Sequence, residues 1–326
     1  MNEGGSNNFS PLGLDLFGEP MKAEGQGPLA NKFLVPPFSV LSAREGAWQE
    51  RKNAWLSLGI ESEVGRAGNL LGFSDAVNKG GYGEQEKEAS ESAGTSVFDP
   101  VLAEVAYRWW SPPGGMVVDP FAGGSVRGII AEKLGRRYWG SELRSEQVAA
   151  NWEQARKICP DARWQDLHWE RGDSRYTMVE APQADFLFTC PPYGNLEVYS
   201  DDPSDLSTME WPQFCSEYYQ ILEKSCERLK DNRFAAIVVG DFRSKEGWCR
   251  DFVSQTIGSF RGAGLELYNE AILVTPVGTC AMRGARIFEG GRKLTKAHQN
   301  LLVFCKGDWK KAHQNICRCE EEGGAK

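Results

Sequence analysis

The chain has 326 residues, of which 41% are hydrophobic, enough for one large α/β domain with a smaller appendage. It contains no apolar run of about 18 residues, and its first residues lack the basic and apolar regions of a signal peptide. These features argue against a membrane-spanning or secreted protein and predict a soluble, cytoplasmic one. The net charge of −8 argues against a polyanionic partner, but the acids gather at Glu84 to Glu91 and Glu320 to Glu322, whereas Arg283 to Lys296 is basic.

Nine cysteines stand at irregular spacings, which is typical of reduced thiols in a cytosolic protein and not of a disulfide framework. One cluster near the carboxyl terminus, His313 with Cys317 and Cys319, has metal-binding residue types but lacks a second ligand pair. We therefore expect no metal site.

The amino-terminal part divides by composition. Residues 1–29 are rich in Gly, Asn, Pro and Ser and predict a disordered tail. Residues 30–73 predict an ordered arm with an extended segment and a helix from Trp48 to Leu58, and residues 74–96 predict a flexible linker. Two interpretations of the arm stay open: it packs against the main domain, or its cations hold a phosphate backbone. Those cations are Arg44, Arg51, Lys52 and Arg66.

The next stretch predicts a ligand site. Asp99 caps a helix that runs to Trp110, and an apolar strand from Met116 to Val118 follows. After that strand come Asp119, Pro120, Phe121, Ala122, Gly123, Gly124 and Ser125, and then a helix from about Val126 to Leu134. Glycines between a strand and a helix let a ligand approach the backbone, and the helix amino terminus adds partial positive charge. The spacing departs from Gly-x-Gly-x-x-Gly, so it does not favour NAD.

Two acids follow at the ends of further predicted elements. Glu142 ends a strand from Arg137 to Leu143, about twenty residues past the glycine turn, where an acid can bind both hydroxyls of a ribose. Asp173 lies in a Gly-Asp-Ser loop, placed to accept a hydrogen bond from an adenine amino group. The alternative for Glu142 is an ordinary surface glutamate, and the alternative for Asp173 is an ordinary turn residue.

The most informative stretch is Thr189-Cys190-Pro191-Pro192-Tyr193-Gly194, after an apolar strand from Ala184 to Phe188. The prolines fix φ and leave carbonyls free to accept hydrogen bonds at the carboxyl edge of a sheet, beside the flat ring of Tyr193. Such a surface suits a planar heterocycle with an exocyclic amino group. Taken alone, the stretch favours an ordinary proline turn that caps a strand, because four-residue motifs recur by chance.

Together these motifs resemble a known family. Asp119 to Ser125 resembles the S-adenosylmethionine motif Asp-Pro-Phe-x-Gly-Ser-Gly, and Cys190 to Tyr193 resembles the catalytic (Asp/Asn/Ser)-Pro-Pro-(Tyr/Phe) motif of the DNA amino-methyltransferases. The resemblance covers about Phe98 to Lys306. It implies a class I, Rossmann-like methyltransferase fold, S-adenosylmethionine contacts from Glu142 and Asp173, and methylation of cytosine N4 or adenine N6 in DNA.

Cys190 departs from the family pattern, because a thiol is a weaker hydrogen-bond acceptor than Asp, Asn or Ser. We therefore expect the carbonyls of Cys190 or Pro191 to hold the amino protons, with Cys190 as a crude serine analogue, which tilts the expected base toward cytosine. A nucleophilic Cys190, as in cytosine C5 methylation, is disfavoured because those enzymes resemble a Pro-Cys order.

The rest of the chain completes an α/β, doubly wound, mostly parallel sheet of about seven strands with a terminal antiparallel strand. Further helices are expected at Ser145 to Ile158, Trp211 to Leu229 and Trp248 to Phe260. Further strands are expected at residues 163–167, 234–241, 265–274 and 300–306. We expect the catalytic domain to span residues 97–308 and a charged tail to span residues 309–326.

Recognition of DNA is expected in the basic connection at residues 276–299, which is long for a hairpin loop. Its cations are Arg283, Arg286, Arg292, Lys293 and Lys296, and a solvated loop is the alternative. A polar loop from Tyr199 to Asp205 lies beside the expected site. A target base in a duplex would have to flip out and stack on Tyr193.

Two other functions stay open. RNA guanine-N2 methyltransferases resemble this chain in motif order and in Gly194, and the change at Cys190 is compatible with a catalytically degenerate DNA- or cofactor-binding module. The compact size favours a solitary phage-type enzyme over half of a large restriction-modification system.

Overall fold

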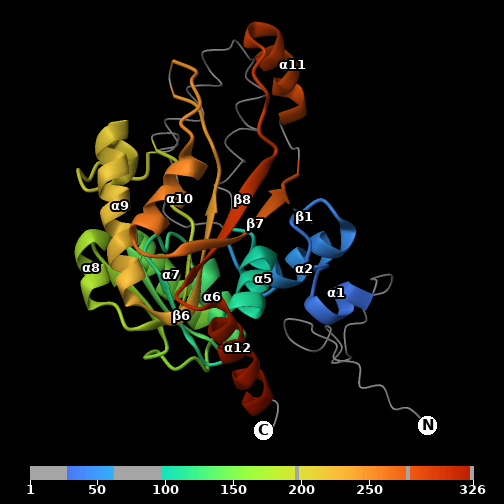
Figure 1. Cartoon of the computed structure of the whole chain (residues 1–326), viewed down its shortest axis with the longest axis vertical. Coiled ribbons are helices and arrows are strands. Elements are labelled where there is room, and N and C mark those ends of the chain that lie inside the picture. Colours follow the sequence, from blue (N-terminus) through green and yellow to red (C-terminus); the bar gives the residue numbers. More distant parts are fainter. Residues whose placement is uncertain (1–27, 62–96, 195–197, 245, 277–279, 324–326) are drawn as a thin grey trace.

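The computed structural model describes residues 28–61, 97–194, 198–244, 246–276 and 280–323 (Figure 1). Its helices are α1 (Pro28–Phe33), α2 (Gly46–Leu56), α5 (Pro100–Trp110), α6 (Val126–Lys133), α7 (Ser145–Ile158), α8 (Ser174–Glu180), α9 (Trp211–Arg228), α10 (Phe252–Gly262), α11 (Cys280–Gly291), α12 (Trp309–Gly323) and the short 3₁₀ helix η1 (Leu206–Thr208). Its strands are β1 (Val40–Ser42), β2 (Met116–Asp119), β3 (Arg137–Glu142), β4 (Leu167–Arg171), β5 (Ala184–Thr189), β6 (Leu229–Val239), β7 (Glu266–Val274) and β8 (His298–Lys306).

The strands form one eight-stranded sheet in the order β1-β7-β8-β6-β5-β2-β3-β4. β8 runs antiparallel to both of its neighbours, and every other pairing is parallel. The predicted doubly wound, mostly parallel α/β fold is therefore confirmed. The sheet has one strand more than expected, because β1 of the amino-terminal arm pairs with β7.

Helices cover both faces of the sheet, because buried strands alternate apolar side chains between two cores. Val117, Phe186 and Phe188 face a core shared with α5, α6 and α7. Val118 and Leu187 face the other core, which α8, α9 and α10 cover. In Figure 1, α8 and α9 lie at the left of the view, and α1 and α2 lie at the right.

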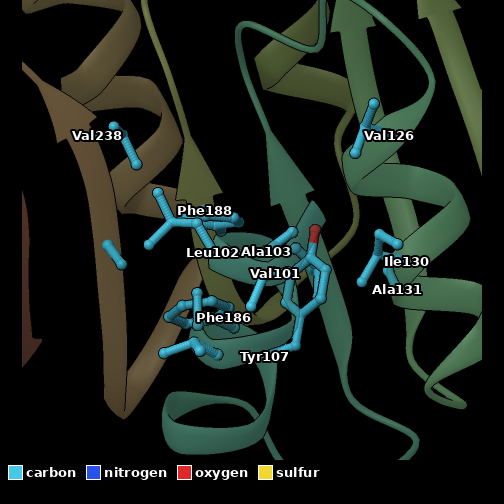
Figure 2. Close-up of a cluster of buried hydrophobic side chains, with 14 of the residues drawn as sticks. Val101, Leu102, Ala103, Tyr107, Val126, Ile130, Ala131, Phe186, Phe188 and Val238 are labelled. Atoms are coloured by element: carbon cyan, nitrogen blue, oxygen red, sulfur yellow. The ribbon is translucent and has the colours of Figure 1, made fainter. Parts of the chain in front are cut away.

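Helix α5 packs across the middle of the sheet. The Asp99 carboxylate caps it, accepting hydrogen bonds from the backbone N–H groups of Val101 and Leu102. Its apolar side meets β5 and α6 (Figure 2), and the Tyr107 ring lies 5.4 Å from the Phe188 ring, edge to face. The Tyr107 hydroxyl donates to the Arg127 carbonyl at 2.9 Å. This helix therefore joins β5 and α6, the two elements that carry the sequence motifs.

The amino-terminal arm packs against α5 through a buried carboxylate. Glu104 is inaccessible to solvent and accepts hydrogen bonds from the Trp55 indole at 2.8 Å and from Arg51 Nε at 2.7 Å. Burial raises the pKa of Glu104, but Arg51, Arg108 and Trp55 together outweigh it and hold that pKa below 4.5.

Two other cations of the arm, Lys52 and Arg44, also have partners within the chain. Lys52 pairs with Asp99 at 3.5 Å, and Arg44 donates to the Thr275 carbonyl at 2.7 Å. Arg66 lies outside the described residues. These contacts favour the packing interpretation of the arm.

Several boundaries differ from those expected. β4 begins at Leu167, where the predicted strand ended, because Arg163 and Asp166 close a turn with an ion pair at 2.6 Å. α8 was not predicted from the sequence.

Two further helices lie in segments expected to be irregular. α11 occupies half of the connection at residues 276–299, and the charged tail forms α12, which buries Ala312 and Ile316, four residues apart. Most of the expected tail at residues 1–29 and of the linker at residues 74–96 lies outside the described residues. Within the described part of the chain, no helix has the length and apolar character needed to cross a bilayer.

Candidate functional site

The carboxyl ends of β2, β3, β4 and β5 meet at one pocket of about 560 Å³, a volume within the range of ligand sites. The pocket is lined by all but one of the cofactor-binding and catalytic residues that the sequence singled out, the exception being Asp119. From the glycine loop these are Pro120, Phe121, Ala122, Gly123, Gly124 and Ser125; from the next two strand ends, Glu142 and Asp173; and from the end of β5, Cys190, Pro191, Pro192 and Tyr193. The structure therefore brings the two motifs, some 70 residues apart, to one cavity.

Asp119 does not line the pocket but lies buried beneath it. Its carboxylate accepts hydrogen bonds from Thr189 Oγ1 at 2.6 Å, Tyr138 Oη at 2.9 Å and Arg127 Nε at 2.6 Å. It also accepts one from the Phe121 N–H at 3.1 Å. One carboxylate thus connects β2, β3, β5 and α6. The geometry makes Asp119 a residue that positions both loops.

Arg127 supports the glycine loop from within. Its Nη2 donates to the Phe121 carbonyl at 2.6 Å and to the Ala122 carbonyl at 3.0 Å, and its guanidinium lies 4.6 Å from the centre of the Phe98 ring. Burial lowers the pKa of Arg127, but the Asp119 charge, with contributions from Tyr138 and Cys190, outweighs burial and raises the pKa above its usual value. Arg127 therefore stays cationic, as the buried partner of Asp119.

The glycine loop also rests on a buried row of amides. Gly123 adopts a left-handed backbone with φ of +51°, and its carbonyl accepts a hydrogen bond from Asn151 Nδ2 at 2.7 Å. Asn151 Oδ1 accepts from Gln147 Nε2 at 2.9 Å. Gln147 Oε1 in turn accepts from Arg144 Nη2 at 2.8 Å. This chain of contacts fixes the loop against α7.

Glu142 and Asp173 present their carboxylates at neighbouring strand ends. Glu142 Oε1 accepts from the Arg144 N–H at 3.0 Å. The Asp173 carboxylate caps α8 through the Arg175 N–H at 2.9 Å and also pairs with the Arg175 guanidinium. Arg175 bridges onward to Glu217 at 2.7 Å. Both acids are thus held at the pocket wall, with Asp173 partly neutralised by Arg175.

The Cys-Pro-Pro-Tyr segment continues from β5 into the pocket. Its tyrosine, Tyr193, is fixed by Gln299 Nε2, which donates to the Tyr193 hydroxyl at 3.0 Å, and by the Phe252 ring, edge-on at 6.2 Å. Burial and the neighbouring Cys190 raise the pKa of Tyr193, so its hydroxyl stays protonated. Gly194 adopts a φ of +55° and packs against Phe242, which leaves no room for a Cβ. The segment is therefore rigid on both sides of the ring.

The five cations expected to recognise DNA lie in and after α11. Arg286 and Arg292 are exposed, and Lys293 and Lys296 are half-buried; none of these four lines the pocket. Lys296 Nζ lies 4.0 Å from Asp241 Oδ2. The Arg283 side chain lies outside the described part of the structure. DNA recognition by this segment stays a prediction.

Sequence reasoning missed Arg127, Asn151, Gln147 and Gln299. The spacing of Gln147 and Asn151 contained a signal, since polar residues four apart share one helix face, here beside the apolar face of α7. Nothing local distinguishes Arg127 or Gln299, whose roles depend on tertiary contacts. Among the described residues, no three His, Cys, Asp or Glu side chains gather as metal ligands.

The chain is similar in sequence to the Type II methyltransferase M.PvuII from Proteus hauseri, with 32% identity over 83 residues, which are 26% of this chain and 25% of that protein. The similarity thus spans about a quarter of the length of that relative. No protein-family model matches the chain.

Two solved structures show similar folds. TrmN from Thermus thermophilus has 17% identity and a TM-score of 0.43, covering 64% of this chain and 49% of that one. The magnesium protoporphyrin IX methyltransferase (ChlM) from Synechocystis PCC 6803, solved with bound SAM, has 11% identity and a TM-score of 0.41, covering 78% of this chain and 90% of that one. The partial sequence similarity to a methyltransferase agrees with the resemblance that the two motifs indicated.

Proposed function

We propose that this protein is an S-adenosylmethionine-dependent methyltransferase that modifies the exocyclic amino group of a base in DNA, cytosine N4 or adenine N6. The observation that carries the proposal is the meeting of the glycine loop after β2 and the Cys-Pro-Pro-Tyr segment after β5 in one pocket. Partial similarity to a Type II methyltransferase supports the same reading.

The residues on the glycine-loop side fit the cofactor. The Glu142 carboxylate at the end of β3 suits a ribose, the backbone at Gly123 and Gly124 allows close approach, and Phe121 offers a ring at the pocket wall. When bound, S-adenosylmethionine supplies an electrophilic methyl group. Asp173 would lie toward the adenine, although its ion pair with Arg175 makes it a weaker acceptor than an unpaired carboxylate.

The other side of the pocket suits a planar base. An exocyclic amino nitrogen is a poor nucleophile because its lone pair is delocalised into the ring, so acceptors for its protons must draw it out of the plane. The carbonyls of Cys190 and Pro191 are positioned by prolines that have no N–H groups, and Tyr193 provides the flat surface beside them. The Cys190 thiol adds only a weak acceptor. A base from duplex DNA would enter by flipping out of the stack.

The experiment that tests the proposal is mass spectrometry of nucleosides after incubation of the protein with deuterated-methyl S-adenosylmethionine and either DNA or total RNA. We expect label in N4-methylcytosine or N6-methyladenine from DNA. Label confined to N2-methylguanosine from RNA would replace the DNA proposal with RNA methylation, and absence of label with intact cofactor binding would indicate a degenerate binding module.

A pair of variants ties the label to this site. Tyr193→Leu removes the aromatic face and should abolish most of the label, whereas Tyr193→Phe keeps the ring and loses the hydroxyl contacts with Gln299 and Cys190. If both variants methylate like the wild type, the ring has no role in binding the base.

A further inference from the structure

The most exposed tryptophan of the described residues lies on a loop that the proposed chemistry does not use. Trp248 is 77% exposed, although burying an indole is among the most favourable contributions a side chain can make to folding. It lies in the segment between β6 and α10, residues 241–244 and 246–251, which we call the Trp248 loop. A single exposed apolar side chain is normal on a protein surface, so the neighbours of this indole decide whether it marks a binding surface.

The loop is ordered by its own backbone contacts. The Ser244 N–H donates to the Trp248 carbonyl at 2.8 Å, and the Gly247 N–H donates to the Ser244 carbonyl at 2.9 Å. Arg243 and Cys249 pair as an antiparallel bridge. The indole is therefore presented by a tight hairpin-like turn, which reduces the entropy lost when it binds.

The base of the loop touches the candidate catalytic segment. Phe242 packs against Tyr193, with ring centres 6.5 Å apart, and fills the space beside Gly194. The Arg250 N–H closes the loop on the Phe242 carbonyl at 2.9 Å. Trp248 is thus carried on a turn whose base forms one side of the Tyr193 environment.

Two cations lie beside the turn that carries the indole, at Gly247. Arg243 is exposed and donates to the Gly247 carbonyl at 3.1 Å, and Lys293, from the basic segment after α11, lies against Gly247. A second exposed apolar side chain, Leu294 at 77%, adjoins Lys293 in sequence. The acids of the loop are Asp241, Glu246 and Asp251. Asp241 Oδ2 lies 4.0 Å from Lys296 Nζ, and Asp251 accepts a hydrogen bond from Ser254 at 2.7 Å. Figure 1 shows the segment after β6 and helix α11 projecting from the same end of the molecule.

We propose that the Trp248 loop is a nucleic-acid contact element, in which the indole stacks on an unpaired DNA base next to the target while Arg243 and Lys293 contact flanking phosphates. An exposed aromatic ring between cations is complementary to a strand whose bases are unstacked and whose backbone is anionic. A flipped target leaves its neighbours without a stacking partner, and an apolar side chain can fill that gap. The inference rests on the proposed function, because it takes DNA as the substrate.

The test measures binding of the full chain to a mixed-sequence DNA duplex and to its separated single strand, over a range of salt concentrations. Trp248→Ala should weaken binding to the single strand roughly 5- to 100-fold, the loss expected for one stacked base, with an unchanged slope of log K against log salt. Trp248→Phe should restore most of the affinity. Arg243→Gln and Lys293→Gln should each reduce the slope by about 1.

Trp309→Ala is the matched control. Trp309 is 49% exposed and begins α12, which follows the antiparallel strand β8 and so lies at the opposite end of the sheet. It should bind DNA as the wild type does. The inference is overturned if Trp248→Ala binds DNA with wild-type affinity, or if both tryptophan variants lose affinity equally. If the wild-type protein still methylates DNA in that case, the proposed function stands. A wild-type protein that neither binds nor methylates DNA would overturn both.

Discussion

Replacement of Asp119 by Asn should destabilise the fold and weaken cofactor binding together. The buried carboxylate accepts four hydrogen bonds, one of them within an ion pair to Arg127 at 2.6 Å. An amide of the same size places an N–H₂ group against one of these donors and leaves the Arg127 charge uncompensated. Removal of one partner of a buried ion pair costs about 3–5 kcal/mol of unfolding free energy. The glycine loop should also shift, since Arg127 holds two of its carbonyls.

The assay combines urea unfolding with calorimetric titration of S-adenosylmethionine. Asp185→Asn is the control, because Asp185 is also buried and accepts from Met116 N at 3.1 Å, Lys230 Nζ at 2.8 Å and Arg233 Nε at 3.2 Å, but lies at the opposite end of β5. It should lower stability without changing cofactor affinity. Our account of Asp119 is refuted if Asp119→Asn stays within about 1 kcal/mol of the wild type, or if both variants bind the cofactor equally well.

Three further predictions concern other parts of the structure. Because the pKa of Glu104 lies below 4.5, the ionised carboxylate stabilises the fold fully above pH 4.5, and this stabilisation is lost as the pH falls through the folded-state pKa. Glu104→Gln should therefore be less stable than the wild type at neutral pH and should lose less stability on acidification. Unfolding curves recorded from neutral to acidic pH test this. Gly140→Ala would place a Cβ 2.6 Å from the Tyr138 hydroxyl and 2.8 Å from Ala122 Cβ. Thermal and urea unfolding should therefore show that the free energy of unfolding falls by about 1–3 kcal/mol. The control is Gly258→Ala, which has open space around it and should be neutral or stabilising. Cys190→Ser should keep methyl transfer or raise it by up to about ten-fold, because a hydroxyl is a better acceptor than a thiol; a complete loss in a rate assay would contradict the serine analogy.

The sequence predicted those parts of the fold whose signals are local. Apolar runs bounded by Gly or Pro marked β2 and β5, and the Asp99 cap placed the start of α5. The motifs after both strands were expected at one sheet edge, and both line the same pocket. Parallel strands bring their carboxyl ends to one side, so this placement needed no knowledge of side-chain contacts.

Features set by distant contacts were not predicted. The motif predicts Asp119 as a pocket residue, but hydrogen bonds from Tyr138 and Thr189 hold its carboxylate in the protein interior. β1 is too short to be distinguished by pattern alone and forms because β7 offers it three backbone partners. Helix α11 was not predicted because it contains Gly284, Gly290 and Gly291, and glycine disfavours a helix.

The buried contact between Glu104 and the arm has a consequence for how the chain folds. The composition divides the protein into an arm and a catalytic domain, but the Glu104 carboxylate of the domain pairs with the Arg51 guanidinium of the arm and accepts a hydrogen bond from the Trp55 indole. A fragment beginning at Val97 would retain Arg108 as the partner of Glu104 and lose both contacts from Arg51 and Trp55. The arm and the catalytic domain should therefore unfold cooperatively, in one melting transition. Partial proteolysis should not release a stable core.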